Sequence, residues 1–273
     1  MRIYICPLIT KFLRIRALYN LFLPQQGGGT EIIAMEINVK NLQEKLDFLL
    51  DKYSVDTSAK LISAETAEIG GKTAPLLPWR NERRFTELKN LTVDGTINGI
   101  SVMRTLRIVP KTESLEKNIA RELDLCEYIL SDKISEIMTF KNGSAVNIAA
   151  KLSGGIVCTV EVAATLGPDT APIDKHEIIA QQGVACDRVV DTQVPQSSIY
   201  VFTDKKDADT YTDVDFELFG LSVDEAAIVR QVFEAAKNPA LADDLNRSKE
   251  RLDTLLKLSE QSGTEAENIK VEG

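Results

Sequence analysis

The apolar positions of residues 113–132 recur with helical spacing, and the pattern of the remaining chain is organised around this segment. At about 100° per residue, six apolar side chains form one stripe: Leu115, Ile119, Leu123, Cys126, Ile129 and Leu130. Lys117, Arg121, Asp124 and Tyr128 fall together on the opposite side. The segment therefore predicts an amphipathic helix that packs on a sheet and presents two cations, a carboxylate and a phenol on its other face.

After this helix the apolar period changes to that of strands. Turn signals such as Asn142-Gly143 and Gly154-Gly155 separate short alternating runs. The runs are Lys133–Phe140, Ala145–Leu152, Ile156–Ala163, Lys175–Ala180, Ala185–Val190 and Ser198–Thr203. They predict an antiparallel meander with helices on one face. Two amphipathic helices are predicted to follow, at Ser222–Lys237 and Ala240–Gln261.

The first 85 residues alternate between apolar strands and helices. Arg2–Cys6 and Thr30–Val39 have the character of strands, and Ile9–Leu23 has helical spacing. A second helix follows, with Asn41 as its expected cap. This order is typical of a parallel sheet covered by helices. Residues Ala59–Ile69 predict a further short helix.

The predicted fold class is thus α/β plus α+β. A partial parallel sheet over residues 1–85 precedes a larger, open, mainly antiparallel sheet over residues 86–262, with helices on one face. The polar residues 263–273 are expected to form a disordered tail.

Composition narrows the classes of function. A net charge of −9 and a pI near 4.9, with no basic patch along the sequence, argue against a nucleic-acid partner. No uninterrupted apolar run reaches the roughly 20 residues of a membrane span. The four cysteines lie far apart in apolar runs, which predicts free thiols and a cytoplasmic protein. A single histidine, His176, excludes a multi-histidine metal site; we expect it to be structural, and we expect no metal.

A cationic turn in residues 73–85 is the first candidate for binding. Arg80, Arg83 and Arg84 surround Trp79, the only tryptophan. The turn is either a solvated loop anchored by the indole ring, or a lip that binds an anion or a carbonyl group, because guanidinium groups hold oxygen-rich ligands. The sequence leaves both readings open.

Familiar catalytic motifs are absent from the chain. There is no G-x-G-x-x-G between a strand and a helix, no Walker motif, no G-x-S-x-G elbow and no metal triad. Nothing in the sequence makes a complete catalytic constellation by itself.

The order of several segments nevertheless resembles that of the glucose–fructose oxidoreductase, inositol dehydrogenase and MocA (Gfo/Idh/MocA) family of NAD(P)-dependent dehydrogenases. The resemblance covers roughly residues 3–237. It rests on the segments IYICPLITKF, TEIIAMEINV, PLLPWRNERRF, ELKNLTVDGTINGISVMRTLRIV, NIARELDLCEYIL, GSAVNIAAKL and HEIIAQQGVACDR. It implies a Rossmann-type nucleotide-binding unit within 1–85, lacking its first part, and a substrate and oligomerisation domain at 86–262.

The resemblance also implies roles for particular residues. It places Pro7, Glu36 and Trp79 beside an NAD or NADP cofactor. The helix that bears the family's Asp-x-x-x-His-x-x-Asp pattern corresponds to 113–132, so the catalytic positions fall on Lys117, Arg121 and Asp124.

Substrate binding is expected from Arg80, Arg84 and Tyr128, and the substrate is expected to be a sugar or polyol. Departures from the family pattern are equally visible. The family's Glu-Lys-Pro falls on Glu36, Ile37 and Asn38, and only Asp124 keeps its family identity on the catalytic helix. An arginine at position 121 cannot cycle protons near neutral pH, because its pKa lies above about 12.

Two functions follow from these matches and departures. The first is a divergent, truncated NAD(P)-dependent oxidoreductase. The second is a non-catalytic pseudoenzyme or assembly subunit that uses its sheet domain for binding and for homo-oligomerisation through the open face, where Val157, Thr159 and Ala163 point away from the helices. A gene fragment is a third reading.

Overall fold

The computed structural model of the protein describes residues 38–187, 198–202, 209–212 and 220–271. Both Pro7 and Glu36, and the strands and helix predicted before residue 37, lie outside these residues. Within the described part of the chain, no helix is both long enough and apolar enough to pass through a membrane.

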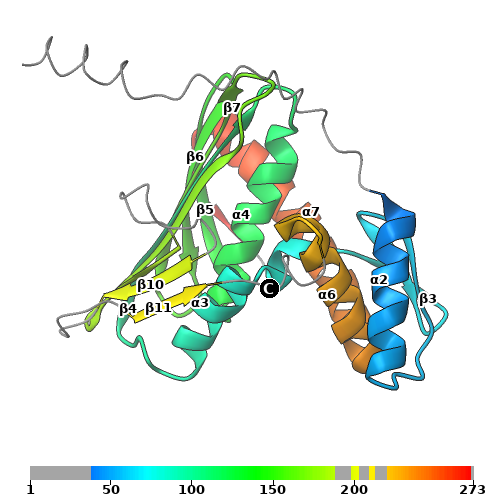
Figure 1. The fold of residues 1–273 in the computed structure, drawn as a ribbon. Coiled ribbons are helices and arrows are strands. Elements are labelled where there is room, and N and C mark those ends of the chain that lie inside the picture. Colours follow the sequence, from blue (N-terminus) through cyan, green and yellow to red (C-terminus); the bar gives the residue numbers. More distant parts are fainter. Residues whose placement is uncertain (1–37, 188–197, 203–208, 213–219, 272–273) are drawn as a thin grey trace, which may run out of the picture. The chain divides into compact units, whose positions relative to one another are not determined.

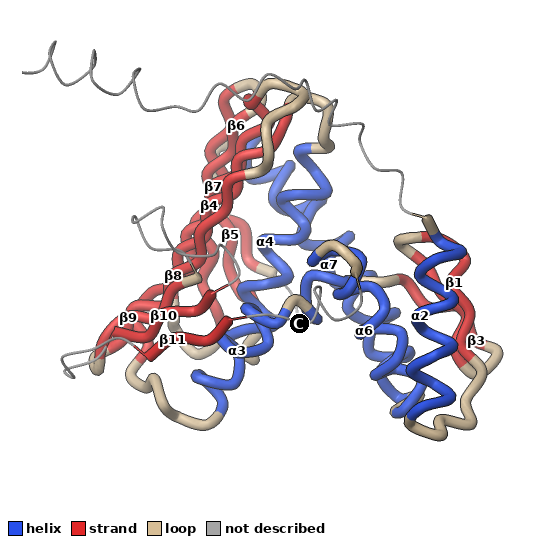
Figure 2. The backbone as a smooth tube through the Cα atoms, in the orientation of Figure 1, coloured by secondary structure: helices blue, strands red, loops and turns tan. Residues whose placement is uncertain are grey.

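Nine strands of the described residues form one open sheet in the order β11-β10-β9-β8-β4-β7-β6-β5-β12 (Figures 1 and 2). Their bounds are β4 Ile100–Pro110, β5 Ile134–Asn142, β6 Ala145–Leu152, β7 Val157–Leu166, β8 Ile173–Ala180, β9 Gly183–Cys186, β10 Ser198–Phe202, β11 Asp209–Thr212 and β12 Ile269–Lys270. Four of the six predicted strands are confirmed over most of their length. Of the other two, Ala185–Val190 ends at Cys186, with residues 188–190 outside the described part, and Ser198–Thr203 is confirmed as far as Phe202. The predicted meander is interrupted, because β4 lies between β7, which it pairs with in parallel, and β8, which it pairs with antiparallel.

The hairpin between β5 and β6 shows why the turn signals were informative. Asn142 pairs with Ala145 across the turn, and Gly143 has a φ of 57°. This left-handed conformation costs glycine little, whereas a β-branched residue would be strained there.

Helices α3 (Arg83–Val93), α4 (Leu115–Leu130) and α7 (Ala240–Glu265) lie on one face of the large sheet (Figure 2). Along β7, Cys158 and Val160 are buried toward these helices, and Val157 and Glu161 are exposed on the other face. Leu123 and other stripe residues of α4 belong to the same buried cluster as the sheet. The predicted amphipathic helix and its apolar stripe are thus confirmed.

A second group of elements packs around its own core. It consists of α2 (Val39–Lys52), β1 (Ala59–Ser63), β2 (Thr66–Ile69), β3 (Lys72–Pro75) and α6 (Val223–Lys237). The helix predicted at Ala59–Ile69 is wrong: β1 and β2 form an antiparallel hairpin, since Leu61, Ala67 and Ile69 are buried against α2 and α6 only in the extended conformation. The three-stranded sheet β1-β2-β3 is antiparallel. The strands predicted for a parallel sheet, Arg2–Cys6 and Thr30–Val39, lie outside the described residues except for Asn38 and Val39, which begin α2.

Two boundaries differ from prediction. Helix α2 is capped by Asn38, not Asn41, because the Asn38 side chain accepts a hydrogen bond from the backbone N–H of Asn41 at 3.2 Å. The disordered tail predicted at 263–273 is corrected as far as Lys270: α7 extends to Glu265, and β12 then pairs with the edge of β5, which orders this segment.

The predicted class, α/β plus α+β with a large open sheet and helices on one face, is confirmed. The described part of 1–85 shares its core with α6 and the start of α7. Assignment of residues 1–85 to a nucleotide-binding domain and of 86–262 to a substrate and oligomerisation domain stays a prediction.

Candidate functional site

The helix α4 begins at a capping residue, Ser114, and carries its polar residues at helical spacing. The side chain of Ser114 accepts a hydrogen bond from the backbone N–H of Lys117 at 3.2 Å, and Ser131 ends the helix with a φ of 51°. Lys117, Arg121 and Asp124 consequently share one side of α4, as their spacing predicted. Different elements pack against that side at successive turns of the helix, so each of the three residues has a different environment and different partners.

Lys117 lies in water. Its side chain is 70% exposed, and its Nζ is 2.5 Å from Oε1 of Glu65, which is equally exposed in the turn between β1 and β2. The Lys117 amine is therefore a surface cation whose ion pair is exposed to solvent.

Arg121, one turn further, belongs to a buried network of ions. Its guanidinium bonds to Glu122 and Glu82, the latter at 3.0 Å, and it lies 3.4 Å from Asp174 on β8. Burial alone would lower the pKa of Arg121, but Glu82, Glu122 and Asp174 raise it far above its usual value. Arg121 is therefore a permanent cation that donates to three carboxylates.

Arg84 joins the same network from α3. Its guanidinium contacts Glu82 at 2.7 Å, Asp174 at 2.9 Å and Asp187 at 3.0 Å. The side chain of Arg84 is 14% exposed, and all of its charge is met by these carboxylates. The substrate-binding role predicted for Arg84 thus competes with three internal partners.

His176 occupies the centre of this network and is fully buried. Nδ1 lies 2.6 Å from Asp187, and Nε2 lies 2.8 Å from Glu122. A ring with a carboxylate at both nitrogens donates from both, which is the charged imidazolium form. Burial lowers the pKa of His176, but Asp187 and Glu122 outweigh it and raise the pKa to about 9. The structural role expected for His176 agrees with these hydrogen bonds.

The charges of this network, which we name the buried ion cluster, balance. Its cations are Arg84, Arg107, Arg121 and His176, and its anions are Glu82, Glu122, Asp174 and Asp187. Sequence reasoning missed all four of these carboxylates and Arg107. The spacing of Asp174 and His176 on one face of a strand was a usable signal for Asp174.

Asp124 forms a separate site with η1 (Pro78–Asn81), the short helix before α3. Nε1 of Trp79 donates to Oδ2 of Asp124 at 2.6 Å, and Nε of Arg80 donates to the same oxygen at 2.7 Å. Nη2 of Arg80 donates to Oδ1, which completes a bidentate pair. Burial lowers the pKa of Arg80, and Asp124 more than compensates and raises it.

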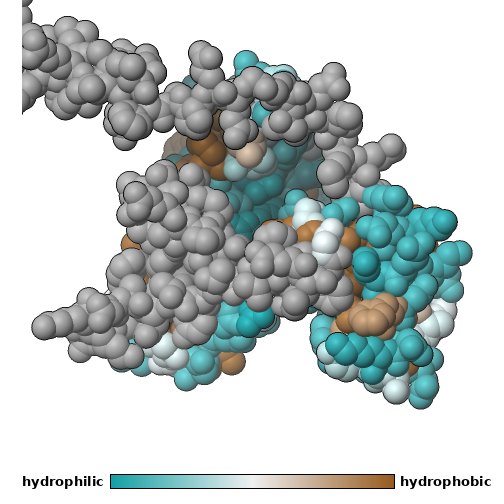
Figure 3. Space-filling model, viewed as in Figure 1, coloured by the Kyte–Doolittle hydropathy of each residue, from teal (hydrophilic) through white to brown (hydrophobic). Residues whose placement is uncertain are grey.

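The three residues predicted to be catalytic are thus kept apart. Lys117 is in solvent, Arg121 is in the buried ion cluster, and Asp124 is paired with Arg80. Trp79 is predicted to contact the cofactor. Its only hydrogen-bond donor, the indole N–H, is bound to Asp124, so Trp79 could contact a ligand only through the face or edge of its ring. The surface over α4 in the hollow at the centre of Figure 3 is hydrophilic.

Beside the Asp124 site lies a pocket of about 610 Å³ between η1, α3, α4, α6 and α7. Arg80, Tyr128 and Lys89 line its inner wall, and the guanidinium carbon of Arg80 is 5.4 Å from the Tyr128 ring centroid. Two of the predicted substrate-binding residues, Arg80 and Tyr128, are therefore brought together here, and Arg84 is not. Lys89 was missed, since nothing in the helical pattern of α3 distinguishes it from a solvated lysine.

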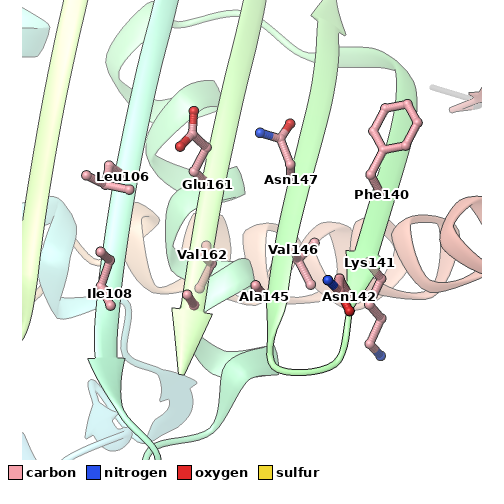
Figure 4. Close-up of a pocket in the computed structure, with 11 residues that line it drawn as sticks. Leu106, Ile108, Phe140, Lys141, Asn142, Ala145, Val146, Asn147, Glu161 and Val162 are labelled. Atoms are coloured by element: carbon pink, nitrogen blue, oxygen red, sulfur yellow. The ribbon is translucent and has the colours of Figure 1, made fainter. Parts of the chain in front are cut away.

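The open face of the sheet carries a second hollow, of about 460 Å³ (Figure 4). Figure 4 shows Leu106 and Phe140 in one row across the strands, with Glu161 and Asn147 between them. Ile108 and Ala145 lie one row along. Phe140 is 57% exposed. The alternation predicted for β7 is confirmed, and an oligomer interface on this face stays a prediction.

The described residues contain no group of three or more His, Cys, Asp or Glu side chains arranged to hold a metal ion. Cys126 and Cys158 are buried free thiols, as predicted, and Cys186 is buried as well. Cys6 lies outside the described residues.

Comparison with known proteins defines the class of fold. No protein-family model matches the chain. No curated protein matches it either. Solved structures do match, and they are oxidoreductases of the Gfo/Idh/MocA type, which confirms the resemblance at the level of the fold.

Three of these structures illustrate the similarity. A probable dehydrogenase from Thermotoga maritima superposes with a TM-score of 0.52 and 16% identity, over 71% of this chain and 63% of its own. Levoglucosan dehydrogenase in complex with NADH and levoglucosan superposes with a TM-score of 0.56 and 12% identity, over 72% of this chain and 65% of its own. An oxidoreductase from Agrobacterium radiobacter in complex with NAD+, L-tartaric acid and magnesium superposes with a TM-score of 0.55 and 12% identity. This match covers 72% of this chain and 64% of that protein. The match thus spans less than two thirds of each of these proteins.

Proposed function

We propose that the protein is a Gfo/Idh/MocA-like oxidoreductase that acts on a sugar or polyol with NAD or NADP. The observation that supports this proposal is the fold, since the solved structures that share it include dehydrogenases bound to NADH or NAD+. In such a reaction the cofactor would accept a hydride from the substrate. Fold alone is a weak guide to chemistry, so the residues of the site have to be weighed as well.

The described residues do not make a nicotinamide site on their own. Trp79 has its indole N–H bound to Asp124, and the other predicted cofactor residues, Pro7 and Glu36, lie outside the described part. The cofactor assignment therefore rests on the likeness of the fold to dehydrogenases bound to NADH or NAD+.

A specific observation favours the second function, a non-catalytic binding or assembly subunit. Oxidation of an alcohol requires a group that accepts a proton. Arg121 is held as a permanent cation by three carboxylates, and Asp124 is held by Arg80 and Trp79. Arg121 is therefore unable to accept a proton, and both carboxylate oxygens of Asp124 accept hydrogen bonds from neighbouring side chains.

Titration of the full chain with NADH and with NADPH tests the first function. Saturable quenching of protein fluorescence or enhancement of cofactor fluorescence supports it, and turnover with a panel of sugars and polyols would establish the reaction. No response at millimolar cofactor would end the cofactor proposal and leave the binding subunit. Location in the cytoplasm and the choice between NAD and NADP remain predictions.

A further inference from the structure

Lys89 on α3 lines the pocket beside Asp124, and its side chain is half-buried there. The pocket volume of about 610 Å³ lies in the range of small-molecule sites, which is roughly 300–1,000 Å³. The lining is mixed, with apolar side chains, two amides, a hydroxyl and charged groups of both signs. Lys89 differs from the other charged groups of this lining in its partners.

The other charged groups of the lining each belong to an ion pair. The pairs are Arg80 with Asp124, Lys133 and Arg251 with Glu127, Arg247 with Asp244, and Glu234 with Lys237. Among the residues that the structure describes, no carboxylate lies within ion-pair distance of Lys89, and its Nζ instead lies 4.0 Å from the centroid of the Tyr128 ring. The ring attracts an ammonium group, but it carries no charge that would neutralise one.

Asp124, the acidic group that acts electrostatically on Lys89, is already committed to other donors. Its Oδ2 accepts hydrogen bonds from Trp79 at 2.6 Å and from Nε of Arg80 at 2.7 Å, and its Oδ1 accepts one from Nη2 of Arg80. The guanidinium carbon of Arg80 lies 5.4 Å from the same Tyr128 ring centroid. Two cations therefore lie near one ring, and the carboxylate is bound to only one of them.

The surroundings of Lys89 favour its neutral amine. Burial and then the positive charge of Arg80 lower the pKa of Lys89, and Asp124 opposes them only in part. A larger fraction of neutral amine is therefore present near neutral pH, and the neutral amine is the form that attacks a carbonyl group. A lysine that is partly desolvated beside another cation is activated for Schiff-base chemistry in this way.

Arg80 supplies a hydrogen-bond donor for the oxygen of such a carbonyl group. Its recorded bonds use Nε and Nη2, and Nη1 has no hydrogen-bond partner among the residues that the structure describes. Because Asp124 fixes the plane of the guanidinium, a ligand loses little entropy in ordering it. A fixed cationic donor stabilises the negative charge that develops on a carbonyl oxygen under attack.

We propose that Lys89 forms an imine with a small polar aldehyde or ketone that binds in this pocket. Nζ of the neutral amine forms a bond to the carbonyl carbon, and the π electrons of the C=O bond move to the oxygen, which takes one proton from the nitrogen. The C–O bond then breaks, the hydroxyl group leaves as water with the second proton of the nitrogen, and a C=N bond remains. This inference goes beyond the proposed oxidoreduction and does not rest on it, because the step needs no cofactor, oxidant or reductant.

Reductive trapping on the full chain tests the proposal. The probe is glyceraldehyde, a small hydroxylated aldehyde, and sodium cyanoborohydride converts any imine to a stable amine whose position peptide mass spectrometry identifies. We expect Lys89 to be labelled at least about tenfold faster than Lys117 at neutral pH, because the pocket brings the amine and the carbonyl group together. The rate at Lys89 should also saturate as the glyceraldehyde concentration rises.

Lys117 is a stringent internal reference, because its side chain is 70% exposed and lies outside the pocket. Two matched variants locate the reaction. Lys89→Arg keeps a cation at this position but removes the amine, so the fast, saturable labelling of the chain should be lost. Lys117→Arg makes the same change on the surface, and the fast labelling should remain.

Labelling of Lys89 no faster than that of Lys117, or a rate at Lys89 that rises in proportion to glyceraldehyde without saturation, would overturn the proposal. The outcome is separable from the cofactor titration. Fast, saturable labelling of Lys89 without any response to NADH would keep this site and remove the oxidoreductase. A response to NADH without preferred labelling of Lys89 would remove this site alone.

Discussion

Nε2 of His176 on β8 lies 2.8 Å from Oε2 of Glu122 on α4, with both side chains fully buried. This contact joins the central helix to the sheet through a charged pair, not through apolar packing alone. It requires a protonated ring, because Asp187 occupies the other ring nitrogen. The stability of the fold should therefore depend on the charge of one histidine.

The free energy of unfolding should fall as the pH rises from about 6.5 to about 9. His176 has its pKa raised from 6.5 to about 9 in the folded chain. Its stabilising contribution is complete below the unfolded pKa and is lost as the pH rises through the folded pKa. A loss on the order of 3 kcal/mol is expected. Urea unfolding at a series of pH values measures this loss. In His176→Gln the free energy of unfolding should not fall in this way between pH 6.5 and about 9. If it falls as in the unaltered chain, the pH dependence comes from other groups.

Arg121→Met should destabilise the protein by about 3 to 5 kcal/mol. The change leaves Glu82, Glu122 and Asp174 buried with one cation fewer, and an uncompensated buried charge is costly. Lys117→Met, four residues earlier on the same helix, should have little effect since Lys117 and Glu65 are exposed. Chemical denaturation of both variants compares them directly. Equal effects would contradict the division between a buried and a solvated ion pair.

Asp124→Asn and Asp124→Ala should differ in the fluorescence of Trp79, the only tryptophan. Asparagine keeps an acceptor for the indole N–H but removes the charge that holds Arg80, so stability should fall by about 2 kcal/mol or more while the emission maximum stays. Alanine removes both contacts and admits water, so its emission should move to longer wavelength. A shift of the same size in both variants would show that the hydrogen bond to Trp79 does not set its environment.

Leu106→Glu should convert a homo-oligomer into monomers if the open face is the interface. Leu106 and Phe140 flank the hollow on that face, and a carboxylate there would be buried against a second copy (Figure 4). Phe48→Glu is the control, since Phe48 is 55% exposed on α2, away from the large sheet. Light scattering at micromolar concentration gives the mass of each. A strict monomer for the unaltered chain would dismiss the interface.

Local patterns predicted the elements of the large sheet well. The stripe of α4 and the Asn142-Gly143 turn each depend on residues close in sequence, and both are present. The hairpin at Ala59–Ile69 was mistaken for a helix because alanine, glutamate and lysine favour helices locally. Backbone pairing between β1 and β2 and burial of Ile69 outweigh that preference.

The buried ion cluster was beyond sequence reasoning for a different reason. Arg121 was recognised as part of a polar face, yet its partners Glu82 and Asp174 come from distant parts of the chain. Without the position of β8, the face of α4 looked like a cleft open to substrate. The helical spacing correctly predicted that these polar residues share one side of α4. It could not predict which distant segments of the chain would pack against that side.

The place of β4 has a consequence for how the chain is made. Thr105 of β4 pairs with Val160 on one side and with His176 on the other, so both neighbours of this central strand are synthesised long after it. Closing such long loops is slow, because their entropy is lost before any contact is gained. During translation both edges of β4 therefore stay unpaired until β7 and β8 have been synthesised. The β4 segment is where the nascent chain would most need a chaperone.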